Sequence, residues 1–263
     1  GRGKLIRFTS GLSAITEIGT DELDGLGQLG CPSGVALSSG LIYISDPANE
    51  EIKTYRTTDF GFTGISLRGS TNGPGQLNDP GHLGVSSSGE VFVIDGRTSV
   101  KKFRADGTFS DSTAASMNQV FNGIHVDPNG THLVTRVTQG ENELTGFREF
   151  ESDFSLARTS STFDFLAPYG ITRDRNGFVY VTDTTSNSVK VYNPANNYGF
   201  RLSFDAPGVP PMSFGKPLSL AIDHRGNILI ADTDNHRILK FSSQGEFIAA
   251  YGTYGSLPGE FFH

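Results

Sequence analysis

The sequence has little of several features that identify common protein classes. It contains one cysteine, two methionines and no tryptophan. A single cysteine, Cys31, excludes an intrachain disulfide framework and a cysteine-rich zinc site. No run approaches 18 apolar residues, so no transmembrane helix is expected. The 263 residues are enough to bury a core without a disulfide or a structural metal.

Positive charge is also scarce. The formal net charge is −7, with 28 acidic against 21 basic residues. The longest basic run is Lys101-Lys102. Because sequence-independent nucleic-acid binding depends on clustered lysine and arginine, a nucleic-acid partner is not expected.

Long stretches of helical periodicity are missing too, whereas glycine and aromatic residues are abundant. The chain has 33 glycines and 20 phenylalanines. Five segments align on a short apolar strand, a turn glycine, a second strand and an Asp column six residues after that glycine. The glycine and column residues are Gly40 and Asp46, Gly89 and Asp95, Gly130 and Arg136, Gly177 and Asp183, and Gly226 and Asp232. This spacing indicates a true internal repeat.

Each repeat predicts a four-stranded meander. After the column comes an apolar strand that ends in an aromatic residue, and a less regular fourth strand follows. Repeats of about 40–50 residues built in this way are blades of a β-propeller. The expected fold is therefore all-β, a single propeller domain. Its blades are expected at 32–79, 80–121, 122–167, 168–216 and 217–263, with 1–31 as the outer strands of a split blade.

The last repeat carries a sequence that resembles the NHL repeat. The stretch Asp232-Thr-Asp-Asn-His-Arg-Ile-Leu-Lys-Phe241 is similar to the motif that names this family, and the loops 27–32 and 75–80 resemble its connections between blades. The resemblance implies a propeller of, most commonly, six blades. On that count the chain holds five complete blades and half of a sixth, whose outer strands would be 4–8 and 14–18.

Three explanations of the incomplete blade are open. The chain is a piece of a longer polypeptide that closes the ring itself, or another chain supplies the missing strands in an assembly, or the fold tolerates a half blade. Unpaired strand edges require some cover. Self-assembly through this blade is therefore one of the partner expectations.

The Asp column is interpreted as structural. Its carboxylates are expected to accept N–H groups of the loop that follows, in an Asx-type turn. The residues assigned this role are Asp46, Asp95, Asp183 and Asp232, with Asn235 and Arg237. The alternative, a ring of calcium ligands, requires six to eight oxygens at one point, which one aspartate per blade does not supply.

Histidines are the remaining candidates for a metal or acid–base centre. His82 and His125 lie on first strands, those nearest the axis of a propeller. Amidating lyases with NHL-like propellers are zinc enzymes with histidines in that region, so the resemblance implies a comparison. Zinc catalysis needs about three protein ligands, and the two histidines occupy different depths. No cofactor is expected, with zinc or calcium as the alternative, and no catalytic residue is assigned.

Binding is expected on the loops that follow second strands and join blades, since such loops carry function over a rigid scaffold. The third repeat departs from the others because Arg136 replaces the aspartate. Arg136, with Arg97 and Arg104, is a candidate for contact with an anionic group. The full set of binding candidates is Arg97, Arg136, Glu141, Asp234 and His236.

These observations favour a non-enzymatic interaction or structural scaffold over an enzyme. A protein or glycan partner is expected, in an extracellular or cell-envelope location. Asn129-Gly130-Thr131 is a glycosylation sequon. The alternative is a metal-dependent propeller enzyme, a lyase or hydrolase, with its site in the central channel.

Overall fold

The computed structural model describes residues 5–8, 14–18, 29–115, 119–138, 145–160, 165–206, 213–255 and 259–261. All strands within these ranges belong to antiparallel sheets, and the helical segments are three short 3-10 turns, Pro47–Asn49, Pro194–Asn196 and Thr233–Asn235. No helix in the described ranges is long and apolar enough to cross a membrane.

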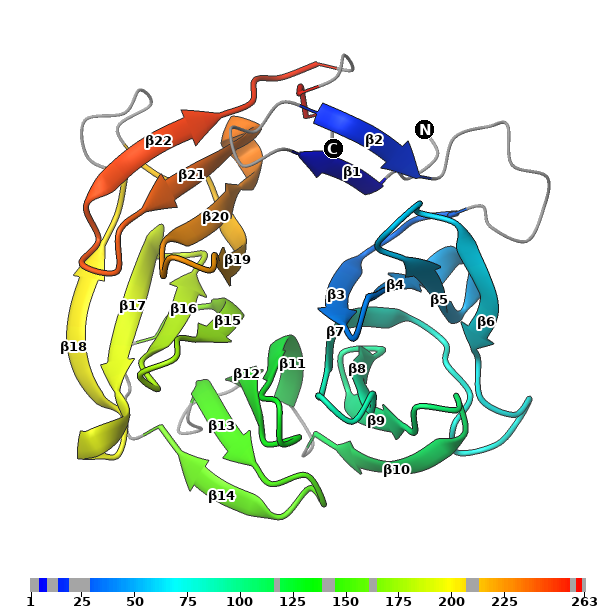
Figure 1. Cartoon of the computed structure of the whole chain (residues 1–263). Helices are drawn as coiled ribbons and strands as arrows, with labels where there is room; N and C mark the ends of the chain where they lie inside the picture. Colours follow the sequence, from blue (N-terminus) through cyan, green and yellow to red (C-terminus); the bar gives the residue numbers. More distant parts are fainter. Residues whose placement is uncertain are drawn as a thin grey trace. The chain divides into compact units, whose positions relative to one another are not determined.

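Five sheets have four strands each, and within every sheet the strands pair in chain order (Figure 1). The first two sheets comprise β3 (Gly34–Ser38), β4 (Leu41–Asp46), β5 (Glu51–Arg56) and β6 (Phe62–Leu67), and then β7 (Pro80–Val85), β8 (Val91–Asp95), β9 (Ser99–Phe103) and β10 (Phe109–Ala114). The third comprises β11 (Gln119–Val126), β12 (His132–Thr138), β13 (Gly146–Phe150) and β14 (Leu156–Thr159).

The remaining sheets follow the same plan. The fourth comprises β15 (Pro168–Arg173), β16 (Val179–Asp183), β17 (Ser188–Asn193) and β18 (Gly199–Phe204). The fifth comprises β19 (Pro217–Ile222), β20 (Ile228–Asp232), β21 (Arg237–Phe241) and β22 (Phe247–Tyr251). The expected all-β fold of four-stranded antiparallel propeller blades is confirmed.

The expected blade count is wrong. The described residues form five four-stranded blades, not six, and show no half blade. β1 (Leu5–Phe8) and β2 (Ala14–Ile18) pair only with each other, in a separate two-stranded sheet. The physical reason is that a blade is defined by ladder hydrogen bonds between successive strands. Neither β1 nor β2 makes such bonds to a strand of another sheet.

The chain forms two compact units. One comprises Gly1–His132 and Phe150–Leu156, and the other Leu133–Glu149 and Ala157–His263, so the boundary passes through the third sheet. Each unit has its own apolar clusters. Leu67, Leu83 and Phe103 belong to one in the first unit, and Val191, Phe214 and Phe241 to one in the second.

The position of a strand within its blade explains its residue types. The second strands of blades two and four, β8 and β16, are buried along their whole length and are mostly hydrophobic. Fourth strands such as β14 and β18 are largely exposed and mix polar with apolar residues. The five turn glycines between first and second strands all have positive φ, between 77° and 88°, which L-residues with a Cβ rarely adopt.

Candidate functional site

The aspartate column, defined as Asp46, Asp95, Asp183 and Asp232, lies at the ends of the second strands of four blades. All four residues are almost fully buried. Each carboxylate accepts backbone N–H groups. Asp95 Oδ1 accepts from Asn78 and Asp79 at 2.9 Å, and Asp183 accepts from Leu166 at 3.0 Å and Ala167 at 2.9 Å.

The direction of these bonds corrects the expected Asx turn. The donors lie in the loop that precedes the blade, 16 or 17 residues before the aspartate, and not in the loop that follows it. Asp46 likewise accepts from Gly30 and Cys31, and Asp232 from Gly215. Neither Asp46 nor Asp232 caps the short helix that comes after it. The aspartate column therefore binds the loop that precedes each of these four blades to the end of the second strand of that blade.

Each column aspartate also has a cationic partner on the third strand. The distances are 2.6 Å for Lys101 Nζ to Asp95, 2.7 Å for Lys190 Nζ to Asp183, 2.6 Å for Arg237 Nε to Asp232 and 3.8 Å for Lys53 Nζ to Asp46. Of these cations only Arg237 was expected. Asn235 donates to Asp232 at 2.9 Å, as its assignment requires. Carboxylates bound to N–H donors and cations do not fit a ring of calcium ligands.

Burial raises the pKa of the Asp183 carboxyl, but the hydrogen bonds from Lys190, Leu166 and Ala167 outweigh it and leave the pKa below its ordinary value. The ionised form is thus the one that the fold stabilises. This is the behaviour of a structural carboxylate bound to several donors.

The other binding candidates belong to several different strands and turns. Arg136 is buried near the end of β12. Arg97 is exposed before β9 and donates to Asn122 at 2.5 Å, whereas Arg104 follows β9 and donates to the Phe109 carbonyl. Because β9 separates Arg97 from Arg104, these two side chains do not converge.

The remaining candidates lie in turns. Asp234 is exposed and its N–H donates to Gly215, and His236 has a left-handed backbone with its ring 4.8 Å from that of Tyr254. Asn129 is exposed in the β11–β12 hairpin, where its Oδ1 accepts from the Thr131 N–H. Glu141 lies outside the described residues.

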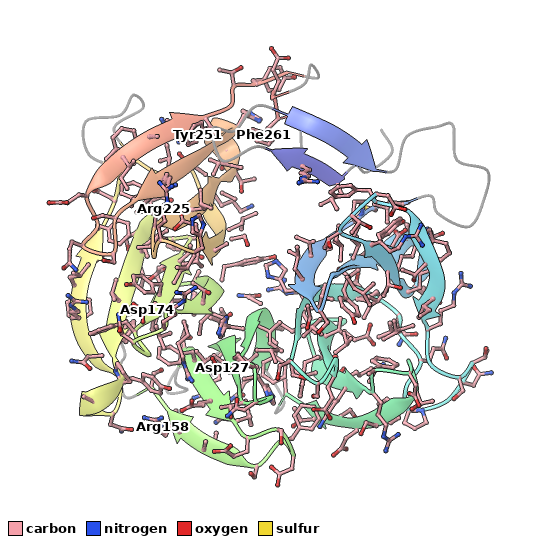
Figure 2. The ribbon with its side chains drawn as sticks, in the orientation of Figure 1. Asp127, Arg158, Asp174, Arg225, Tyr251 and Phe261 are labelled. Atoms are coloured by element: carbon pink, nitrogen blue, oxygen red, sulfur yellow. The ribbon has the colours of Figure 1, made fainter. Side chains whose placement is uncertain are left out.

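The histidine pair expected for the zinc alternative does not form a metal site in the described part of the chain. His82 is on β7, where burial lowers the pKa of its imidazole. His125 is on β11, and its Nε2 lies 3.3 Å from Asp127 Oδ1. Asp127, which is labelled in Figure 2, follows the last residue of β11 in the chain. No group of three His, Cys, Asp or Glu side chains within the described ranges is placed to hold a metal ion.

Sequence reasoning missed a buried carboxylate in the second unit. Glu149 of β13 accepts from Arg173 Nη2 at 2.5 Å and from the Tyr198 hydroxyl at 2.8 Å, and Arg158 Nε lies 2.8 Å away. Burial raises the pKa of Glu149, but these partners outweigh it and hold the pKa below its ordinary value. Figure 2 labels Arg158 on β14. Four segments supply the network, and no local spacing pattern reveals it.

A second missed group is His132, in the first unit. Its ring is fully buried among three phenylalanines, with centroids 4.8 Å from Phe92, 5.4 Å from Phe150 and 5.2 Å from Phe154. Its Nδ1 lies 3.2 Å from the Gly130 carbonyl. Burial lowers the pKa of His132 to about 4, so the imidazole is neutral at physiological pH.

Two known proteins that are similar to part of the chain are named as lyases. The chain is 34% identical over 105 residues to the probable peptidyl-alpha-hydroxyglycine alpha-amidating lyase pgal-1 of Caenorhabditis elegans, which covers 37% of this chain and 29% of that protein. It is 32% identical over 109 residues to peptidyl-alpha-hydroxyglycine alpha-amidating lyase 1 of Drosophila melanogaster, covering 37% of this chain and 20% of the relative. The chain thus spans less than a third of either relative.

Solved structures with the same fold are more distant in sequence. A streptogramin B lyase has a TM-score of 0.61 at 17% identity, covering 84% of this chain and 68% of that one. A chain from the crystal structure of a nidogen/laminin complex has a TM-score of 0.65 at 15% identity, covering 83% of this chain and 79% of that one. At such identities the likeness shows the fold alone.

These findings correct the functional expectation. The named relatives are enzymes, which contradicts the expected non-enzymatic scaffold and the expectation that the chain is not an enzyme. The comparisons give no support to the expected role as a protein-binding scaffold. The NHL resemblance holds at the level of a related propeller family, because the model that matches residues 34–256 is that of the SMP-30/gluconolactonase/LRE-like region. That match spans most of the chain, and the protein belongs to the SMP-30/gluconolactonase/LRE-like family of β-propellers.

Proposed function

We propose that this protein is a propeller enzyme of the lyase class that cleaves a carbon–nitrogen bond in an N-acyl-α-hydroxyglycine. The observation that carries the proposal is the 34% identity over 105 residues to an amidating lyase. The finer assignment of the blades as NHL repeats is part of this proposal, since the motif at 232–241 supports it. A protein or glycan partner and an extracellular location stay predictions.

The proposed reaction removes a proton from the substrate hydroxyl and adds a proton to the substrate nitrogen. An α-hydroxyglycine carries a hydroxyl and an acylated nitrogen on the same carbon. A base removes the hydroxyl proton, the carbonyl of glyoxylate forms, the carbon–nitrogen bond breaks, and the nitrogen takes a proton to become a primary amide. A positioned side chain that moves a proton in such a step typically contributes about 10²–10⁴-fold.

His125 with Asp127 is the pair best suited to this role. The Nε2–Oδ1 distance is 3.3 Å, and the two side chains are 23% and 18% exposed, so the imidazole can reach a substrate. The hairpin that follows β11 fixes Asp127, because its N–H donates to Thr131 and its carbonyl accepts from Gly130. A carboxylate beside an imidazole orients the ring and stabilises its protonated form.

The test is release of glyoxylate and peptide amide from an N-acyl-α-hydroxyglycine by the purified chain. We expect turnover by the wild-type protein and a fall in kcat/KM of about 100-fold in His125→Gln. His224→Gln is the matched control, because His224 is exposed in the β19–β20 hairpin. Absence of glyoxylate release by the wild type rejects the proposed function. If the His125→Gln variant turns over the substrate as fast as the wild type, only the assignment of His125 as the base is rejected.

Lactone hydrolysis is the second candidate, and the family model that names gluconolactonase favours it. Opening of an aldonolactone by water also needs a proton acceptor, so the same variants serve both assays. Acid release from a lactone without glyoxylate release would select hydrolase over lyase.

A further inference from the structure

The four blades that carry the aspartate column repeat one arrangement of apolar side chains on their first and second strands. The residue two positions before the column aspartate is opposite an apolar residue of the first strand. These cross-strand pairs are Val35 and Ile44, Leu83 and Val93, Ile171 and Val181, and Leu220 and Ile230. Because side chains alternate between the two faces of a strand, both members of a pair lie on one face of their blade, which we call the front face.

The preceding blade covers the front face in three of these four blades. A large side chain on its second strand joins the apolar cluster of the blade that follows. These contacts place Leu83 in a cluster with Tyr43, Ile171 in a cluster with Leu133, and Leu220 in a cluster with Tyr180. As a result, Leu83, Ile171 and Leu220 are only 6%, 5% and 9% exposed.

The front face of blade one is exposed at its first strand. Val35, at the position of Leu83 in blade two, is 49% exposed, and Leu37, two residues further along β3, is 68% exposed. The apolar cluster on this face includes residues of β4 and β5 together with Leu5 of β1, but no described residue of β3. The side of the face at β4 and β5 therefore has a neighbour in β1, whereas the side at β3 is open to solvent.

β1 also has an edge that can accept a strand. Among the described residues it pairs only with β2, so its other edge makes no ladder hydrogen bonds there. An unpaired edge of this kind is a template for an added strand. The exposed residues of β3 and the unpaired edge of β1 both belong to the first unit. A β-hairpin with one apolar face provides a strand for this edge and side chains to cover β3.

We propose that the front face of blade one, at Val35 and Leu37, binds a β-hairpin of a second polypeptide, which pairs with the free edge of β1. The covered blades indicate its chemistry: two antiparallel strands with a large apolar or aromatic side chain on the second, in the role of Tyr43 and Tyr180. The first and second strands of this chain do not supply the hairpin, because those in the described residues already belong to four-stranded sheets. The surface does not include His125, and it does not depend on the lyase assignment.

Titration calorimetry of the full chain with a hairpin peptide tests the surface. The probe has the sequence of β15 and β16, residues 168–183, and a short glycine linker joins its ends, Pro168 and Asp183, which are paired in the structure. The linker preorganises the hairpin and so lowers the cost of binding. We expect saturable binding of one peptide per chain, with slower amide hydrogen exchange at residues 5–8 of β1. The same peptide with Tyr180→Ser should bind at least about tenfold more weakly.

Two variants of the protein form a matched pair. Leu37 of β3 and Leu156 of β14 are both exposed leucines on strands, and only Leu37 lies on the proposed surface. Leu37→Glu should weaken binding of the peptide at least about tenfold, because it places a charge against an apolar face. Its Tm should equal that of the wild type, since the side chain is exposed in the free protein. Leu156→Glu should change neither quantity.

Four results would overturn the proposal. Two of them are absence of saturable binding by the wild type and equal weakening of binding by the two variants. A fall in Tm in Leu37→Glu alone would assign the surface to a segment of the same chain. A wild-type dimer in analytical ultracentrifugation that Leu37→Glu alone dissociates would assign it to a second copy. Binding that leaves hydrogen exchange in β1 unchanged would reject the pairing with its free edge.

Discussion

Individual side chains in this propeller are stabilised by partners that lie far along the chain. Asp183, for example, accepts hydrogen bonds from residues 16 and 17 positions earlier and pairs with Lys190 on the next strand. Cys31 illustrates the same point from the donor side. Its backbone N–H donates to Asp46, while its thiol is exposed, so a residue type that is most often buried here lies at the surface.

His132 gives a prediction at this scale, concerning the pH dependence of stability. The folded pKa of about 4 lies below the ordinary histidine value of about 6.5. Between these values the unfolded chain binds a proton that the folded chain does not, so the free energy of unfolding falls as the pH decreases from 6.5 to 4. The loss attributable to His132 is on the order of 3 kcal/mol.

Replacement His132→Phe should reduce that loss, because a phenyl ring fits among Phe92, Phe150 and Phe154 and carries no proton. Urea unfolding at several pH values between 4 and 7 measures the effect. His224→Phe, at an exposed position, serves as the control and should keep the wild-type slope. An unchanged slope in His132→Phe would show that another group accounts for the loss.

At the scale of elements, close packing of first strands depends on glycine. A Cβ at Gly170 of β15 would lie 2.7 Å from the Leu218 carbonyl oxygen of β19, and one at Gly34 of β3 would lie 2.7 Å from the Gly81 carbonyl oxygen of β7. Both contacts are with backbone atoms, which cannot rotate away. Glycine at these positions therefore lets the first strands of neighbouring blades approach closely.

Gly170→Ala should accordingly destabilise the protein by about 1–3 kcal/mol, the usual cost of overpacking. Gly226→Ala is the matched comparison, because its Cβ would meet nothing within 4 Å and its cost is limited to the strain of φ +83°, about 1 kcal/mol. Chemical denaturation of both variants measures the difference. A larger loss in Gly226→Ala than in Gly170→Ala would contradict the packing argument.

At the scale of the whole molecule, buried carboxylates of the second unit link the stability of the fold to pH. Asp183 and Glu149 both have folded pKa values below their ordinary ones. For such groups the stabilisation is present above the unfolded pKa, about 4, and is lost as the pH falls through the lower folded pKa. The chain should therefore lose stability again below pH 4, a window distinct from that of His132.

Urea unfolding between pH 5 and pH 2 measures this second loss. Glu149→Gln should flatten it, and at pH 7 it should cost about 3–5 kcal/mol because it leaves Arg173 facing a neutral partner in a buried network. Glu246→Gln, on an exposed hairpin, should change neither quantity. Stability that rises as the pH falls below 4 would contradict the argument.

The sequence by itself determined the local structure of this protein. The turn glycines and the four strands of each repeat follow from interactions within a few residues, and the regular spacing of the repeat also reveals the aspartate at the end of the second strand. The family, at the level of a propeller related to NHL repeats, could be predicted from the same residues.

Only the tertiary structure decided which groups meet. The loop bound by each aspartate and the network of Glu149 with Arg158, Arg173 and Tyr198 join distant segments. The blade count belongs here too, because β1 and β2 pair with each other and with no other sheet. Such partners are set by strand register and by the packing of sheets, which a linear pattern of residues does not contain.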